Sequence, residues 1–100
     1  MKSYKIVLYK DAILDLKQAL DYYQKINPEI AQKFYQVTNT TLEQLKRNPF
    51  YQIRYDEFRL KVIKGFPYII HFIVEENNKT VKVFGIRNHH QDPETSYFKI

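Results

Sequence analysis

The stretch that decides the fold is residues 11–49, DAILDLKQALDYYQKINPEIAQKFYQVTNTTLEQLKRNP. From Asp11, apolar side chains recur at steps of four and three residues, which is the spacing of one face of an α-helix. They are Ala12, Leu16, Ala19, Tyr23 and Ile26. A second series with helical spacing comprises Ala31, Phe34, Tyr35, Thr38, Leu42 and Leu45. The pattern predicts two helices, the second of which ends at Asn48-Pro49.

The break between the two helices falls at Asn27-Pro28. Asn can cap unpaired N–H groups, Pro suits the first helical turn, and the acidic Glu29 suits the positive end of the helix dipole. Asn before Pro also disfavours continuous α geometry, so one long helix kinked at Pro28 is the weaker alternative. We therefore predict an antiparallel helix hairpin joined by a tight turn.

Strand signals lie on both sides of this hairpin. Residues 4–9 alternate as a strand would, and β-branched and aromatic runs follow Pro49 at 51–56, 58–64, 68–75 and 80–87. Asp56-Glu57, Lys64-Gly65-Phe66-Pro67 and Asn77-Asn78 are the expected turns. The predicted fold class is α+β: an N-terminal strand, an antiparallel helix hairpin, and an antiparallel β-meander. Residues 89–100 are expected to form a short tail or a turn of helix.

A two-residue turn at Asn77-Asn78 predicts the pairing of the last two strands. The expected pairs are Val74 with Val81, Phe72 with Val83, Ile70 with Gly85, and Tyr68 with Arg87. This apolar face is expected to pack on the helices. The opposite face is expected to carry Ile69, His71, Ile73, Lys82, Phe84 and Ile86.

Two cations of the preceding strand are expected to join that opposite face. Leu60 and Val62 are assigned to the core, which leaves Arg59 and Lys61 beside His71. A cationic cleft is predicted there. His71 itself, between Ile69 and Ile73, is interpreted as a structural, hydrogen-bonded histidine.

Composition limits the class of protein. The 100 residues, with nine Tyr and seven Phe, fit one folded domain spanning 1–100, and no Gly/Ser/Pro-rich linker divides them. The absence of Cys excludes disulfides, thiolate nucleophiles and cysteine zinc sites and favours the cytoplasm. No apolar run at the N-terminus is long enough for a signal peptide or a membrane span. The net charge of +5 favours an anionic partner, such as nucleic acid or an acidic protein.

Three short motifs, taken in order, resemble the RelE/ParE toxin superfamily. The first helix reads DAILDLKQALDYY, similar to an Ala…Asp-Leu…Tyr-Tyr pattern, and AQKFYQ follows, similar to an Ala-x-x-Phe stretch. The middle reads RYDEFRLKVIKGFPYIIHFIVEE, which resembles the family's basic strand, Phe-Pro-Tyr and apolar strand. The end, VKVFGIRNHHQDPETSYF, resembles its closing strand with a His/Arg segment and Asp-Pro. The resemblance covers residues 4–98.

This resemblance implies a toxin neutralised by a cognate antitoxin protein. RelE-like members cleave messenger RNA on the ribosome, and ParE-like members inhibit DNA gyrase without a ribonuclease site. Three hypotheses follow: a ParE-like toxin that acts by binding, which we place first; a RelE-like endoribonuclease; and an inactive member that binds only an antitoxin. Seven of the nine tyrosines, at 4, 9, 22, 35, 51, 55 and 97, cannot all be buried in so small a domain. Some are expected to mark an interaction surface, with an antitoxin groove as the natural candidate.

RNA cleavage would need a base, cations for the phosphate and an acid for the leaving oxygen. Each role has a candidate: Arg59 and Arg87 to hold phosphate, Lys61 to add charge, His89 or His90 to move protons, and Tyr97 to stack on a base. Arg59 and Lys61 on an outward strand face are more often solvated edge charges, and Arg87 lies on the core side in the expected pairing unless a bulge turns it outward. The His89-His90 pair lacks a third ligand at a telling spacing, so neither a metal nor a cofactor is expected.

Overall fold

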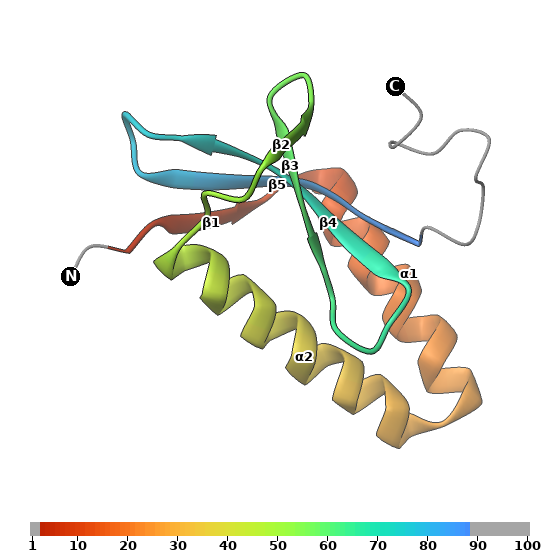
Figure 1. The fold of residues 1–100 in the computed structure, drawn as a ribbon. Coiled ribbons are helices and arrows are strands. Elements are labelled where there is room, and N and C mark those ends of the chain that lie inside the picture. Colours follow the sequence, from red (N-terminus) through yellow and green to blue (C-terminus); the bar gives the residue numbers. More distant parts are fainter. Residues whose placement is uncertain (1–2, 89–100) are drawn as a thin grey trace.

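The computed structural model describes residues 3–88, which form two helices and five strands. In chain order they are β1 (Lys5–Leu8), α1 (Lys10–Ile26), α2 (Pro28–Arg47), β2 (Ile53–Tyr55), β3 (Phe58–Val62), β4 (Tyr68–Glu75) and β5 (Thr80–Asn88). Both helices lie along one side of the sheet (Figure 1). The α+β class and the order of elements are confirmed. The expected tail at 89–100 lies outside the described residues.

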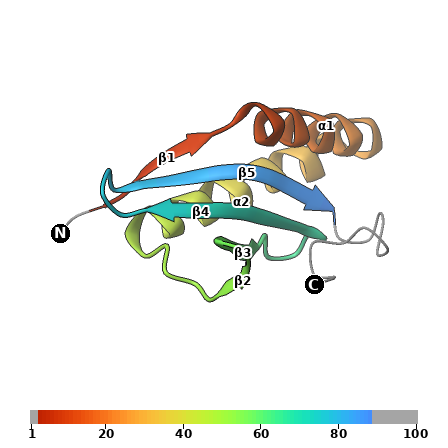
Figure 2. The same ribbon diagram turned by 90° about the horizontal axis from the view of Figure 1, so that it is seen from above.

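The sheet is mixed, with strand order β1-β5-β4-β3-β2. Strands β2 to β5 form the predicted antiparallel meander. Strand β1 lies at the edge of the sheet beside β5 and runs parallel to it, with Ile6 opposite Val81. Figure 2 shows β1 beside β5, and β2 and β3 at the other end of the sheet. The N-terminal strand β1 therefore completes the sheet next to β5.

The helix hairpin turns at Asn27, as predicted. Asn27 has extended backbone angles (φ −166°, ψ 116°), and its side-chain oxygen accepts a hydrogen bond of 2.9 Å from the backbone N–H of Glu29. Its own N–H donates to the carbonyl of Tyr23 and closes α1. One residue thus ends the first helix and caps the second, which separates them into two antiparallel elements.

The core lies between the helix hairpin and the near face of β4 and β5. Its fully buried centre includes Phe34 of α2, Phe72 of β4 and Val83 of β5. The Phe66-Pro67-Tyr68 segment belongs to this core: the rings of Phe66 and Tyr68 lie 5.0 and 5.2 Å from that of Phe34. Burial is the main cause that raises the pKa of Tyr68, as expected for a phenol removed from water. The Phe66-Pro67-Tyr68 segment therefore packs against the helix hairpin.

The predicted pairing of β4 with β5 is right for the half nearest the turn and wrong beyond it. Val74 pairs with Val81 and Phe72 with Val83, but a register shift follows, and His71 then pairs with Gly85 and Ile69 with Arg87. The shift places one extra residue in β5 at Phe84. As a result Ile86 lies in the core, 2% exposed, and Arg87 lies on the opposite face.

The turn between β4 and β5 is also longer than expected. It spans Glu76 to Lys79, closed by the Glu75–Thr80 pair, and the residue with positive φ is Lys79 (φ 50°), not Asn77 or Asn78. The register near the turn is unchanged because the extra residues are added symmetrically.

The prediction for β3 is wrong about which side chains face the helices. Arg59 pairs with Phe72 and Lys61 with Ile70, both core residues, whereas Leu60 pairs with His71 and Val62 with Ile69 on the far face. The buried residue that sets this register is Ile63, at 0% exposed, one position past the end of β3, while Val62 is 55% exposed. At the margin of the sheet the helices no longer cover every near-face position, so long cationic side chains are tolerated there.

Candidate functional site

The face of the sheet away from the helices carries an aromatic cluster around His71. The Tyr55 hydroxyl lies 3.0 Å from Nδ1 of His71, and the Tyr55 ring stacks on Phe58 at 4.9 Å between centroids. Phe84 then links Phe58, at 5.5 Å, to Tyr9, at 4.5 Å. We call these five residues, Tyr9, Tyr55, Phe58, His71 and Phe84, the far-face cluster.

A small cavity of about 200 Å³ opens in the far-face cluster, with Asp11 and Arg87 also in its lining. His71 is 3% exposed, and burial, followed by the charge of Arg87, lowers its pKa to about 4. At neutral pH the imidazole is therefore uncharged. Its burial and its contact with Tyr55 fit the structural role expected from the sequence.

Arg87 is held by a carboxylate from the first helix. Its Nε lies 3.5 Å from Oδ2 of Asp15, and the same oxygen accepts a 3.0 Å hydrogen bond from the backbone N–H of Ile86. Strand β1 pairs only with the first half of β5, so no strand of residues 3–88 meets the N–H of Ile86 at that edge. Asp15 supplies the missing acceptor. Asp15, the Asp of the Asp-Leu in the Ala…Asp-Leu…Tyr-Tyr pattern, thus joins α1 to β5.

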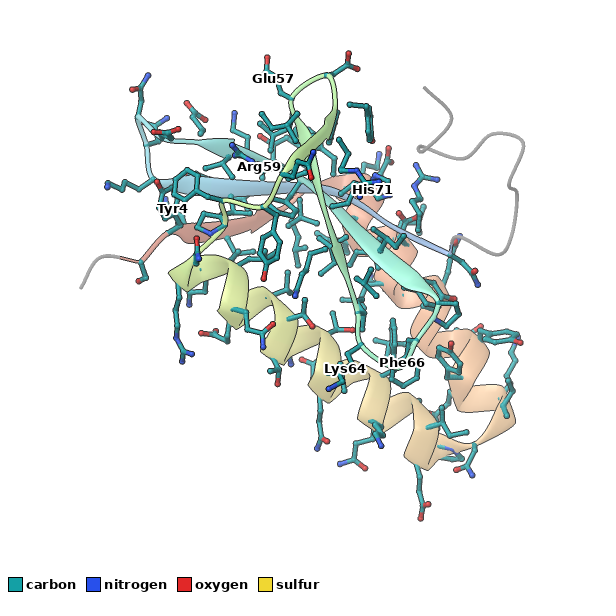
Figure 3. The ribbon with its side chains drawn as sticks, in the orientation of Figure 1. Tyr4, Glu57, Arg59, Lys64, Phe66 and His71 are labelled. Atoms are coloured by element: carbon teal, nitrogen blue, oxygen red, sulfur yellow. The ribbon has the colours of Figure 1, made fainter. Side chains whose placement is uncertain are left out.

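Arg59 and Lys61 lie on the other side of the sheet. The Arg59 guanidinium carbon lies 5.4 Å from the centre of the Phe50 ring, and Lys61 Nζ lies 4.8 Å from that of Tyr51. Figure 3 shows Arg59 on the side of Tyr4, with His71 set apart from both. The expected grouping of Arg59 and Lys61 with His71 is therefore wrong, because β3 presents its odd-numbered residues to the helix side.

The remaining candidates, His89, His90 and Tyr97, lie outside the described residues. Within residues 3–88, no group of three His, Cys, Asp or Glu side chains could hold a metal ion. In the same part of the chain, no helix is both long and apolar enough to cross a membrane.

RNA cleavage requires cations that reach the same phosphate and side chains that are free to transfer protons. Arg59 and Arg87 leave the sheet from opposite faces, and the buried, neutral His71 is in contact with Tyr55. The described residues instead offer surfaces suited to recognition: Tyr22 is 57% exposed and Tyr35 is 49% exposed. Several tyrosines are on the surface, as the Tyr excess predicts.

Sequence reasoning missed Asp15 and the loop aromatics Phe50 and Tyr51. Asp15 had a signal, since it is a lone carboxylate within the apolar face of α1, a position that usually has a partner. Phe50 and Tyr51 follow Pro49 at a strand start and gave no pattern that would place them beside Arg59 and Lys61.

Comparisons with known proteins agree with this fold. The family model described as "ParE toxin of type II toxin-antitoxin system, parDE" matches residues 6–93. Among solved structures, a chain from "Chromosomal ParDE TA system from P. aeruginosa" superposes with a TM-score of 0.73. It is 21% identical, and the match covers 86% of this chain and 96% of that one. A search of curated proteins finds no match. On the family match across nearly its whole length, the chain belongs to the ParE toxin family, the toxin components of type II toxin–antitoxin systems.

Proposed function

We propose that this toxin arrests growth by binding DNA gyrase in the cytoplasm, and that it acts by occupying its target without a chemical step. A toxin–antitoxin system implies a cognate antitoxin that neutralises the toxin. Gyrase is the target that the ParE resemblance implies. Its inhibition requires only a stable complex.

The observation that carries this proposal is the separation of the cations by the sheet. Arg59 pairs with the core residue Phe72, and Arg87 pairs with Ile69 on the far face. Since β4 alternates regularly from Ile69 to Phe72, the two arginine side chains leave the sheet from opposite faces. Arg87 is further engaged by Asp15. This separation argues against a ribonuclease site built from Arg59 and Arg87 together.

The far-face cluster supports a binding role. It combines the apolar rings of Phe58 and Phe84 with the hydroxyls of Tyr9 and Tyr55, and Tyr9 is 38% exposed. Tyr is enriched in protein interfaces because its ring packs while its hydroxyl still bonds to water or a partner.

The test is a pair of reactions with the purified chain. One reaction contains gyrase, relaxed plasmid and ATP, and the other contains translating ribosomes and a reporter messenger RNA. The proposal predicts loss of supercoiling and intact messenger RNA. Breaks in the messenger RNA with unchanged supercoiling would instead establish the RelE-like alternative.

A matched control separates specific inhibition from an effect of added protein. Phe72→Asp buries a charge in the core and is expected to unfold the chain, so that variant should leave supercoiling unchanged. Induced expression of the wild-type chain in growing cells addresses the third hypothesis. Normal growth without an antitoxin would show an inactive member.

A further inference from the structure

Three aromatic rings and three cations lie next to one another around the start of β1, the loop after α2, and β3. Lys79 Nζ lies 5.5 Å from the centre of the Tyr4 ring. The centres of the Tyr4 and Phe50 rings are 5.7 Å apart, and the guanidinium carbon of Arg59 lies 5.4 Å from the centre of the Phe50 ring. Tyr51 follows Phe50 in the chain, and Lys61 Nζ lies 4.8 Å from the centre of the Tyr51 ring. We call these six residues, Tyr4, Phe50, Tyr51, Arg59, Lys61 and Lys79, the ring–cation surface.

Segments distant in the chain build this surface, and backbone bonds hold them in place. The N–H of Tyr4 donates to the carbonyl of Lys46 at the end of α2, with an N···O distance of 2.7 Å. The N–H of Lys5 donates to the carbonyl of Lys79 at 2.8 Å. The start of β1, the end of α2 and the β4–β5 turn are thereby tied together, with the loop after α2 and β3 completing the surface through ring contacts.

Among the described residues, no acid neutralises the cations of this surface. Elsewhere, Lys82 pairs with Glu75, Arg87 with Asp15, and Lys46 with Glu43. Within residues 3–88, by contrast, no carboxylate lies within ion-pair distance of Arg59, Lys61 or Lys79. The Arg59 Nε is buried and has no hydrogen-bond acceptor among those residues. A buried donor without an acceptor carries a free-energy cost, so the guanidinium can bind an anion only through its other N–H groups.

The rings of the ring–cation surface remain open on one side. Phe50 is 49% exposed and Tyr51 is 36% exposed, although both lie beside buried Pro49. An acidic protein segment would need only the cations. Exposed rings that lie beside cations suit a ligand that carries a negatively charged backbone and flat aromatic groups at regular intervals.

We propose that the ring–cation surface binds single-stranded nucleic acid, with Phe50 and Tyr51 stacking on unpaired bases and Arg59, Lys61 and Lys79 contacting the phosphates. This goes beyond gyrase inhibition, because it gives the toxin an affinity for nucleic acid of its own. Stacking on bases is tolerant of sequence, so no sequence preference is expected. Duplexes should bind more weakly because their base faces are already stacked.

The test measures fluorescence anisotropy of a labelled 12-nucleotide single strand titrated with the purified full chain, with no gyrase present. Binding is expected in the range of about 1 to 100 µM, and tighter than for the duplex of the same sequence. Phe50→Ala should weaken binding at least about fivefold, as should Phe50→Leu, which keeps the apolar bulk against Tyr4. Tyr35→Ala is the matched control, since Tyr35 is exposed to the same 49% on α2.

The salt dependence tests the cations separately. Lys61→Gln and Lys79→Gln should each reduce the slope of log Kd against log salt concentration by about 0.7, the value for one phosphate contact on a single strand. Lys33→Gln removes an equal charge from an exposed position in the first half of α2 and should leave the slope unchanged. Thermal melts of every variant confirm that it is folded.

Three results would overturn the proposal. The first is no binding to the single strand at 100 µM protein in low salt. The second is duplex binding as tight as single-strand binding. The third is weakening by the lysine variants but not by Phe50→Ala and Phe50→Leu, with equal competition by a poly-glutamate peptide, which would make the surface a site for acidic protein segments. None of these results bears on gyrase inhibition, which is measured in the absence of added single strands.

Discussion

Strand pairs β4–β5 and β2–β3 differ in what covers them. Near-face residues of β4 and β5 meet both helices, and Phe72, Ile70 and Val83 are fully buried. The corresponding positions of β3 hold Arg59 and Lys61, which lie against loop rings. The same alternation thus produces an apolar core in the centre and a cationic surface at the margin. Alternation alone indicates that a strand has two faces, and only the helix layer determines which face is buried.

The largest expected effect comes from removing a core ring. Phe34 is fully buried against Tyr23, Phe66 and Tyr68. Phe34→Ala should lower the free energy of unfolding by about 3 to 5 kcal/mol, measured by urea denaturation. The next residue supplies the control: Tyr35→Ala should cost less than about 1 kcal/mol, since that ring points to solvent. Equal losses would show that α2 is rotated about its axis, so that both rings pack on the sheet.

The register of β3 can be tested with two neighbouring residues. Ile63→Ala should lower the free energy of unfolding by about 2 to 4 kcal/mol, because Ile63 is 0% exposed. Val62→Ala should cost less than about 0.5 kcal/mol, because Val62 is 55% exposed. The reverse order would restore the pattern expected from the sequence, with Arg59 and Lys61 beside His71.

The buried His71 predicts a loss of stability in acid. Its pKa is about 4 in the folded chain, against an ordinary pKa of 6.5, so the unfolded state binds the proton first as pH falls. The contribution of His71 to the free energy of unfolding is constant above about pH 6.5. It is lost progressively as the pH falls to about 4, by on the order of 2 kcal/mol after allowing for screening. Urea titrations at a series of pH values measure it.

A variant isolates His71 from the carboxylates that also titrate in acid. His71→Gln keeps a polar side chain beside Tyr55 but has no charged form, so its stability should fall less between pH 6.5 and 4 than that of the wild type. Identical pH profiles for the two proteins would contradict a buried, neutral His71.

The smallest of these effects concerns Asp15, which joins α1 to β5. Asp15→Ala removes the acceptor for the Ile86 N–H and the partner of Arg87, and should cost about 1 to 2 kcal/mol in the free energy of unfolding. Asp21, on the same helix, pairs with Lys25 at 3.4 Å in an exposed position, and Asp21→Ala should change stability by less than about 0.5 kcal/mol. Amide exchange at Ile86 should accelerate only in the Asp15 variant.

The parts of the fold that the sequence predicted are those governed by local chemistry. Asn27-Pro28 both ended and began a helix, and the runs at 68–75 and 80–87 became β4 and β5 nearly residue for residue. The parts it could not predict depend on distant packing. The bulge at Phe84 moved Arg87 to the far face, and the register of β3 followed from the burial of Ile63. Candidate site residues on those two strands were therefore misplaced although their strands were correctly predicted.

The stoichiometry of inhibition tests most directly whether the toxin acts by occupying gyrase. With gyrase held at a fixed concentration well above the dissociation constant, increasing toxin should reduce supercoiling linearly until it reaches about one toxin per binding site, and no further. That result is expected of a protein that acts by occupying its target. Full inhibition at a small fraction of an equivalent would reveal turnover, and unchanged supercoiling at a large excess of folded toxin would remove gyrase as the target.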